Sequence, residues 1–339
     1  MSLPKIKIGQ IGVCHEHAGA KMQALRQLTD LFEIVGVVDD RDTTAARFAG
    51  DNLEPYDGLT WMTEDQLLNT PDLQAVLVET PNTDLVPAAM RCMKRNLAMH
   101  MDKPGGEDLA LFRTLLDGCK ERQLPFQMGY MFRSNPAMRF AIKAVHDGWL
   151  GDVFEIQASM SHDYGGDAYQ PYMGQFKGGI MFNLGCHLID LMVQIMGRPT
   201  CVTPFLKTTA GLDDAIKNNC MSVLEYSNAL VTVRACSKEV KGHGKRNLKI
   251  CGTNGSIELV PLERFDGQPL QLQLTLKYPA GDYAEGVHTV DFGIKTNRYT
   301  DQLTELADII HGKITNPFTY EHDALVQEVV LAAAGYRQL

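Results

Sequence analysis

The chain has 339 residues, of which 45% are hydrophobic and 22% charged, and its formal net charge is −9. This length favours two domains, and the composition is typical of a soluble globular protein. A nucleic-acid-binding protein needs a dense Lys and Arg surface, and a membrane span needs about 20 apolar residues, so we expect neither kind of partner.

The cysteines indicate a reducing compartment. All eight are scattered along the chain without a CxxC pair, a pattern typical of free thiols rather than of a disulfide framework or a zinc site. The N-terminal residues also lack the long apolar core of a signal peptide. We therefore expect a cytoplasmic protein.

Residues 1–130 alternate short apolar runs with helical patterns. We predict strands at 5–11, 33–39, 74–79, 97–101 and 125–130, and helices at 17–28, 42–49, 63–68, 83–94 and 107–122. Continuous apolar strands separated by helices predict a parallel sheet covered on both faces, that is, an α/β Rossmann domain with a doubly wound sheet. Ligands of such sheets bind at the carboxyl ends of the strands.

Residues 131–339 have a different rhythm and are predicted to form a second, α+β domain. Here we expect helices at 135–146, 180–196, 297–311 and 321–336, and strands at 153–161, 219–226, 230–237, 247–252, 255–260 and 270–276. Tight-turn signals between several strands predict a large, open, mostly antiparallel sheet.

The first predicted strand ends at the segment Gly12-Val13-Cys14-His15-Glu16-His17. Gly12 can make the sharp turn of a dinucleotide-binding loop, where the backbone approaches a pyrophosphate at a helix N-terminus. Cys14 and His17 stand where further glycines are usual, so by itself the motif is also compatible with a plain strand–turn–helix.

The second strand ends in Asp39 and Asp40. A carboxylate at this point of a dinucleotide fold accepts hydrogen bonds from the adenosine ribose. One of the two can do so while the other caps a helix beginning near Thr43. A carboxylate also repels a 2′-phosphate, so we expect NAD, although Arg41 leaves NADP open.

His15 and His17 form an H-x-H pair that raises the question of a metal site. Metal sites usually need a third ligand, and the sequence offers no convincing nearby Asp, His or Cys to supply it. We therefore expect no metal. Either both imidazoles lie at the mouth of the cofactor or substrate site, or His17 only begins the following helix.

Two further turns follow predicted strands and therefore belong to the same edge of the sheet. The first is Thr80-Pro81-Asn82 and the second is Asp102-Lys103-Pro104. A lysine at this edge can meet substrate and nicotinamide together, whereas the ordinary alternative is a surface lysine.

In the second half, Asn183, His187 and Asp190 lie at i, i+4 and i+7 of the predicted helix 180–196. On an α-helix they form one polar stripe on an otherwise apolar element. Such groups are costly to bury without partners, so we expect a ligand-facing stripe rather than a lone core histidine.

Taken in order, these motifs resemble those of the glucose–fructose oxidoreductase/inositol dehydrogenase (Gfo/Idh/MocA-type) family. The resemblance adds Arg133-Ser134-Asn135-Pro136 at the entry to the second domain and runs along nearly the whole chain. It implies an NAD(P)-binding domain at 1–130 and, at 131–339, a substrate-binding domain whose open sheet forms an oligomer interface, giving a homodimer or homotetramer.

The resemblance also implies hydride transfer between NAD(P) and a hydroxyl-bearing carbon of a sugar, inositol or related polyol. Lys103 would hydrogen-bond the reacting oxygen, His187 would be the general base, and Asn183 would belong to the catalytic set. The implied cofactor contacts are Gly12, Cys14, His15, His17, Asp39, Asp40, Thr80, Pro81, Asn82, Asp102, Lys103 and Pro104. The implied substrate contacts are Lys103, Arg133, Asp163, Tyr164, Asn183 and His187, with Tyr169 in the same loop as a further candidate.

Three residues depart from the family pattern. Cys14 replaces a glycine, Asp102 replaces a glutamate, and Asn183 replaces the aspartate paired with the catalytic histidine. An asparagine can hold a hydroxyl but cannot carry the charge that raises a histidine's basicity. Two alternatives therefore stay open: a catalytically idle dinucleotide- or sugar-binding regulatory protein, and an NAD-dependent glycosidase.

Overall fold

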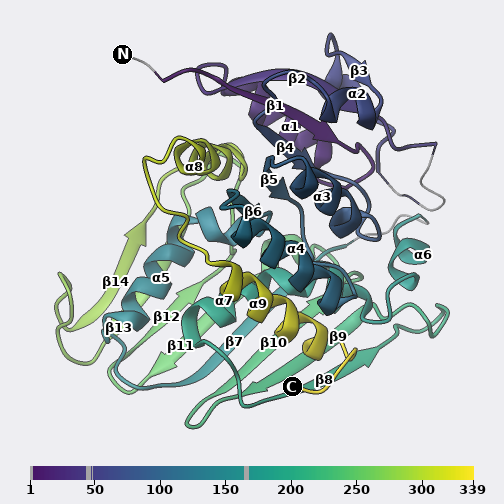
Figure 1. Ribbon diagram of the computed structural model, residues 1–339. Helices are drawn as coiled ribbons and strands as arrows, with labels where there is room; N and C mark the ends of the chain where they lie inside the picture. The colour runs from purple at the N-terminus through teal and green to yellow at the C-terminus, as the bar shows by residue number, and fades with distance from the viewer. Residues whose placement is uncertain (1–2, 43–46, 48, 164–167) are drawn as a thin grey trace. The chain divides into compact units, whose positions relative to one another are not determined.

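The computed structural model describes residues 3–42, 47, 49–163 and 168–339, and it divides into two compact units (Figure 1). The first unit consists of Met1–Tyr130 and Tyr299–Gln327, and the second of Met131–Arg298 and Glu328–Leu339. The sequence placed all of 131–339 in the second domain. The structure differs for 299–327 because the apolar residues Leu303 and Leu306 are buried in the core of the first unit, in the same cluster as Met22 and Leu25.

The first unit contains a parallel sheet with the strand order β3-β2-β1-β4-β5-β6. Its strands are β1 (Ile6–Ile11), β2 (Phe32–Val38), β3 (Trp61–Met62), β4 (Ala75–Val78), β5 (Ala98–Met101) and β6 (Phe126–Met128). The central strands are almost wholly buried, as expected where helices cover both faces. The predicted doubly wound Rossmann sheet is confirmed.

The helices of this unit are α1 (Ala18–Gln27), α2 (Glu64–Leu68), α3 (Leu85–Lys94), α4 (Leu109–Glu121) and α8 (Thr300–Ile310). Side-chain caps fix two of their starts. Thr63 accepts a hydrogen bond from the backbone N–H of Gln66 and completes a capping box, while Asp108 accepts from the N–H groups of Ala110 and Leu111.

The second unit contains a sheet with the strand order β14-β13-β12-β11-β7-β10-β9-β8, in which only the β7–β10 pair is parallel among the described strands. Its strands are β7 (Val153–Ser161), β8 (Cys201–Lys207), β9 (Asn219–Glu225), β10 (Leu230–Cys236), β11 (Asn247–Gly252), β12 (Gly255–Leu259), β13 (Gln271–Leu276) and β14 (Gly286–Asp291). Buried and exposed residues alternate along most of these strands. The predicted open, mostly antiparallel sheet is confirmed.

Helices α5 (Pro136–His146) and α7 (Cys186–Met196) lie over one face of this sheet (Figure 1). Asn135 caps α5 by accepting from the N–H groups of Ala137 and Met138, and Pro136 occupies the first turn. Short helical segments are η1 (Glu54–Tyr56), η2 (Met131–Ser134), α6 (Tyr169–Gly174) and η4 (Gly242–Lys245), and α9 (Tyr320–Ala333) runs from the first unit into the second.

The predicted helix 180–196 is wrong in one respect. Its first turn, η3 (Met181–Gly185), is a π-helix, and regular α-helix begins only at Cys186. The strands β3, β8 and β14 and helix α6 were not predicted, and most of the predicted helix 42–49 lies outside the described residues.

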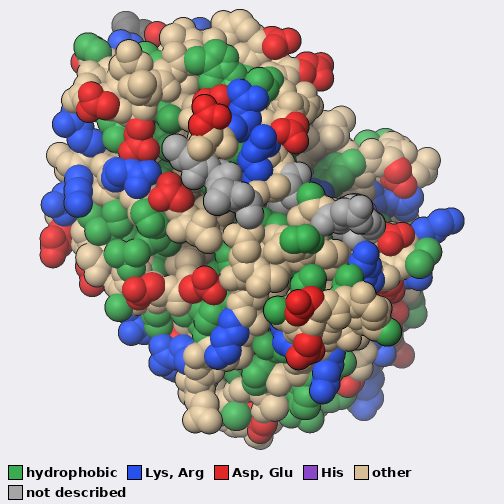
Figure 2. Space-filling view, turned by 90° about the vertical axis from the view of Figure 1, so that its right-hand side faces the viewer, with side chains coloured by type: hydrophobic (Ala, Val, Ile, Leu, Met, Phe, Trp, Pro, Cys, Tyr) green, Lys and Arg blue, Asp and Glu red, His purple; other side chains and the backbone are tan. Residues whose placement is uncertain are grey.

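The face of the molecule shown in Figure 2 carries charges of both signs. Lys and Arg side chains are interspersed with Asp and Glu over the face shown in Figure 2. Within the described ranges, every helix is too short or too polar to cross a lipid bilayer.

Candidate active site

The turn that follows β1 depends on Gly12. Its φ of 92° lies in the left-handed region, and a Cβ atom here would lie 2.6 Å from the backbone nitrogen of Thr80 and 2.7 Å from the carbonyl of Glu79. A side chain would therefore collide with backbone atoms that cannot move aside. The close approach brings the β1 turn against the segment after β4.

The two aspartates after β2 have different surroundings. Asp40 is buried, and its Oδ1 accepts hydrogen bonds from the N–H groups of Val13 at 2.8 Å and Cys14 at 3.1 Å. Burial raises the pKa of Asp40 above its ordinary value. Asp40 thus holds the β1 turn; the alternative of capping a helix near Thr43 lies outside the described residues.

Asp39 remains partly exposed and pairs with a cation. The Arg41 guanidinium donates to both carboxylate oxygens, with Nη2 2.6 Å from Oδ2. This bond lowers the pKa of Asp39. Of the two carboxylates, Asp39 is the one accessible to a ligand.

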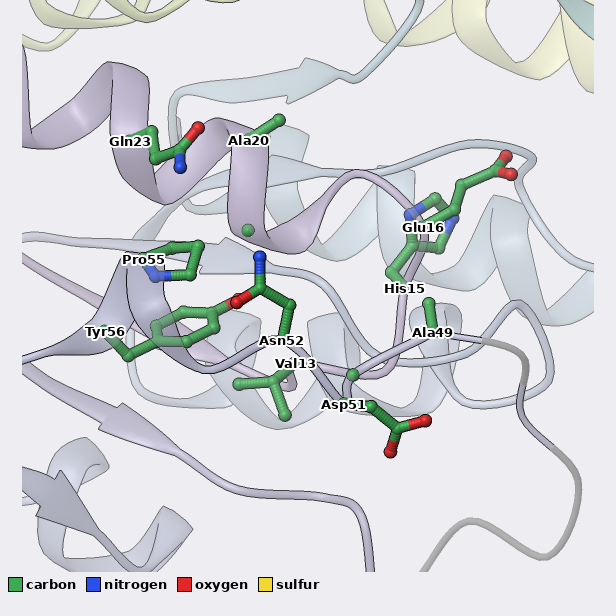
Figure 3. Close-up of a pocket in the computed structure, with 12 residues that line it drawn as sticks. Val13, His15, Glu16, Ala20, Gln23, Ala49, Asp51, Asn52, Pro55 and Tyr56 are labelled. Carbon is green, nitrogen blue, oxygen red and sulfur yellow. The ribbon is translucent and has the colours of Figure 1, made fainter.

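A pocket of about 410 Å³ lies beside the β1 turn and the first two turns of α1 (Figure 3). His15 and Glu16 line one end of it, and Pro55 and Tyr56 line the other. Near it, Thr80 Oγ1 is buried without a hydrogen-bond partner among the described residues. A buried hydroxyl without a protein partner is a position where a ligand can supply the missing bond.

The two histidines of the turn converge on Asp102, which follows β5. His15 Nδ1 lies 3.3 Å and His17 Nδ1 3.0 Å from Asp102 Oδ2, while His15 Nε2 lies 3.1 Å from Asn82 Oδ1. Burial lowers the pKa of His15 to about 3 and also lowers that of His17. Both imidazoles are therefore neutral near pH 7.

We expected no third ligand residue near His15 and His17, and this is wrong. Asp102 is such a residue, because one donor atom from each of His15, His17 and Asp102 lies within 4.8 Å of the others. The sequence missed Asp102 because it is distant in the chain and reaches the histidines only through the parallel order β1-β4-β5. However, the Lys21 ammonium already supplies positive charge there, 2.5 Å from Asp102 Oδ2 and 2.7 Å from Glu79 Oε1. We accordingly interpret the cluster as a hydrogen-bonded ionic network.

Lys103 is fully buried, not a surface lysine. Its backbone N–H donates to Asp102 Oδ1 at 2.6 Å, and its Nζ donates to Glu16 Oε1 at 3.2 Å. The neighbouring candidates Thr80, Pro81, Asn82 and Pro104 are also buried. The structure therefore brings the predicted first-unit residues together along the carboxyl edges of β1, β2, β4 and β5.

Asn183 and Asp190, at the two ends of the polar stripe predicted in the second unit, have different partners. Asn183 lies in the π-helical turn and its amide donates to the Tyr169 hydroxyl at 3.2 Å. Asp190 instead receives Arg133, whose Nη2 lies 2.6 Å from Oδ1 and whose Nε lies 3.1 and 3.2 Å from the two oxygens. Arg133, predicted to bind substrate, is thus fully buried in an ion pair.

His187 lies between these two contacts on the first turn of α7. It is almost wholly buried, and its ring meets the Phe132 ring edge-on with centroids 5.9 Å apart. Asp163 forms an isolated β-bridge with Lys238, and Tyr164 lies outside the described residues.

Sequence reasoning missed Glu16 and Lys21. Lys21 lies on the buried face of α1 with Ala18, Met22 and Leu25, and a lysine in such an apolar stripe was the available signal for a buried ion pair. Glu16 carried no comparable signal, because its partner Lys103 is distant in sequence.

Comparison with known proteins identifies the family to which the chain is similar. Residues 6–130 match an oxidoreductase family model with an NAD-binding Rossmann fold, and residues 138–258 match the GFO/IDH/MocA C-terminal domain. Levoglucosan dehydrogenase of Pseudarthrobacter phenanthrenivorans is 20% identical over 221 residues, 56% of this chain and 56% of that protein. The rhizopine catabolism protein MocA of Rhizobium meliloti is 23% identical over 66% of this chain and 68% of its own length.

Solved structures show the same fold. A levoglucosan dehydrogenase complex with NADH and levoglucosan has a TM-score of 0.78 at 17% identity and covers 99% of both chains. GenD2 from gentamicin A biosynthesis, in complex with NAD, has a TM-score of 0.78 at 18% identity and covers 100% of this chain and 97% of its own.

Proposed function

Because the chain belongs to the Gfo/Idh/MocA oxidoreductase family, we propose that it is an NAD-dependent dehydrogenase of a sugar, inositol or related polyol. The reaction transfers a hydride between the nicotinamide and a hydroxyl-bearing carbon. Levoglucosan dehydrogenase and a 26% identical D-apiose dehydrogenase of Paraburkholderia graminis support this substrate class.

The first unit fits a dinucleotide. Gly12 keeps the β1 turn free of a Cβ, Thr80 Oγ1 offers a buried hydroxyl, and Asp39 offers an accessible carboxylate for ribose hydroxyls. The Asp39 carboxylate disfavours a 2′-phosphate, so NAD is the proposed cofactor. Arg41, already bound to Asp39, would have to leave that carboxylate to serve NADP.

In this proposal NAD⁺, when bound, would supply the hydride acceptor. Lys103 donates a hydrogen bond to the reacting oxygen and stabilises the negative charge that develops on it. His187 takes the hydroxyl proton as general base, and Asn183 holds a substrate hydroxyl. These roles come from the family resemblance, and the structure adds that Lys103 is a buried lysine beside the dinucleotide turn.

That buried lysine, in a chain of an NAD-binding family, is the observation that carries the proposal. Purified protein is incubated with NAD⁺ and a panel containing levoglucosan, apiose, myo-inositol and sugar nucleotides, and NADH absorbance is followed. We expect NADH with at least one compound, and a much larger loss of turnover than of NAD affinity in Lys103→Ala and His187→Ala. NAD binding without NADH formation from any compound would contradict the proposal.

One observation favours a second candidate, a catalytically idle NAD-binding homologue. Asn183 replaces the family aspartate and donates to Tyr169. Asn183→Asp separates the two readings: it would raise turnover in an active enzyme with a weakened base, and create no turnover in an idle one.

We also propose that the protein is a homodimer or homotetramer through the open face of the second sheet. Phe205, Met221 and Leu230 on β8–β10 are 49%, 40% and 57% exposed, and Phe205 and Met221 are direct cross-strand partners. Light scattering after size exclusion should give a multiple of the chain mass, and Met221→Glu should shift it toward the monomer.

A further inference from the structure

The cofactor turn carries an acidic residue that contacts the buried lysine. Glu16 lies between His15 and His17, and its Oε1 accepts a hydrogen bond from Lys103 Nζ at 3.2 Å. The Lys103 side chain is 0% exposed and that of Glu16 14% exposed. A buried ammonium is costly unless a counter-charge is nearby, and Glu16 provides one.

The other charged or titratable groups around Lys103 are engaged elsewhere. Asp102, next to it in the chain, binds the Lys21 ammonium at 2.5 Å. His17 Nδ1 bonds the same aspartate, and His17 Nε2 lies 3.5 Å from Glu16 Oε1. His15 binds Asn82 and Asp102. Among these described residues, Glu16 is the carboxylate that contacts the Lys103 ammonium itself.

We propose that Glu16 is a positioning residue for the dehydrogenase reaction: it holds Lys103 as an ammonium and fixes the direction in which that ammonium points. The proposal rests on the proposed function. It links two parts of the site, because Glu16 belongs to the turn beside the cofactor pocket and Lys103 is the donor to the reacting oxygen. The position of the turn then determines the orientation of the Lys103 ammonium.

Turnover provides the first test. Glu16→Gln keeps the size of the side chain but removes its charge, so Lys103 should lose its proton more easily. We expect the alkaline limb of kcat to move to lower pH by about one unit, with kcat reduced more than KM is raised. Glu16→Asp should restore most of the wild-type pH profile. Glu321→Gln is the matched control, because Glu321 is also a glutamate paired with a lysine, Lys120, but the pair lies on the surface.

The second test needs no substrate. In protein with ¹³C-labelled lysine side chains, the Lys103 signal is identified by its absence in Lys103→Arg and titrated in wild type, Glu16→Gln and Glu321→Gln. A midpoint lower by about one pH unit in Glu16→Gln alone supports the ion pair. An unchanged midpoint overturns the inference whether or not a substrate is found. If the midpoint shifts in Glu16→Gln but the wild-type protein oxidises no polyol, the ion pair is supported and the proposed dehydrogenase is overturned instead.

Discussion

Each unit buries an ion pair near its candidate site, and the two are built differently. In the first unit the Lys21 ammonium lies between two carboxylates from different strand ends, Glu79 and Asp102. In the second unit the Arg133 guanidinium meets the single carboxylate of Asp190. The first arrangement has more acid than base, whereas the second is balanced.

The imbalance has a consequence for protonation. Burial raises the pKa of Glu79 well above its ordinary range. Burial alone would also raise the pKa of Asp102, but His15, Lys21 and His17 hold it well below its ordinary range. The first unit thus has two buried acids whose pKa values are shifted in opposite directions, beside two imidazoles whose pKa values are lowered. The edge of the first sheet is therefore suited to proton exchange, whereas the Arg133–Asp190 pair is suited to holding α7 in place.

Replacement of Lys21 by Met should have the largest effect. It leaves Asp102 and Glu79 buried without their cation, and breaking a buried ion pair costs about 3–5 kcal/mol. Urea denaturation at pH 7 measures the loss. Lys120→Met is the control, because Lys120 pairs with Glu321 on the surface and its removal should leave the free energy of unfolding nearly unchanged. A stability like that of the control would mean that Lys21 is not the counter-charge of the network.

Arg133→Met tests the other side of the comparison. It leaves the Asp190 carboxylate buried without its cation, which should again lower the free energy of unfolding by about 3–5 kcal/mol. Combining it with Asp190→Leu removes both charges, and most of the stability should return. If Arg133 bound substrate, as the sequence predicted, the stable double variant would still show a raised KM; an unchanged KM assigns Arg133 to the scaffold.

Acid should weaken the protein through its buried imidazoles. The pKa of His15 and that of His100 are both lowered from 6.5 to about 3 by burial. Below pH 6.5 these two histidines bind protons in the unfolded chain but not in the folded chain. Their contribution to the free energy of unfolding is therefore complete above pH 6.5 and is lost as the pH falls toward 3. At pH 5 the loss is about 2 kcal/mol for each histidine.

Unfolding free energies at pH 7 and pH 5 check this. His100→Gln isolates one contribution, since the His100 ring makes its hydrogen bond to Gln127. The variant should lose about 2 kcal/mol less than wild type between the two pH values. Equal losses in both proteins would mean that His100 is not held neutral. The raised pKa of Glu79 acts in the opposite direction, but it is common to both proteins.

The sequence was most informative where the pattern was local. Apolar runs and helical periods predicted the parallel sheet, and Asn135-Pro136 marked the start of α5. It failed where partners are remote: the docking of α8 into the first unit, the contact of Glu16 with Lys103, and the convergence of Asp102 on the histidines all depend on tertiary structure. The π-helical turn at Met181–Gly185 has no period of its own, so the expected stripe was drawn through Asn183 and His187 as if the helix were regular.

Replacement of Asp40 by Asn should have the smallest effect on the free energy of unfolding. It is a buried carboxylate that binds the backbone N–H groups of Val13 and Cys14 where Asp190 binds a guanidinium. Asparagine keeps an oxygen acceptor there, so Asp40→Asn should cost about 1 kcal/mol or less, whereas Asp40→Ala leaves two N–H groups without that acceptor and should cost more. Urea denaturation of both variants separates acceptor from charge. A loss in Asp40→Asn as large as that in Lys21→Met would mean that the charge itself holds the turn, and the first unit would then contain two ionic centres, the Lys21 network and the Asp40 turn.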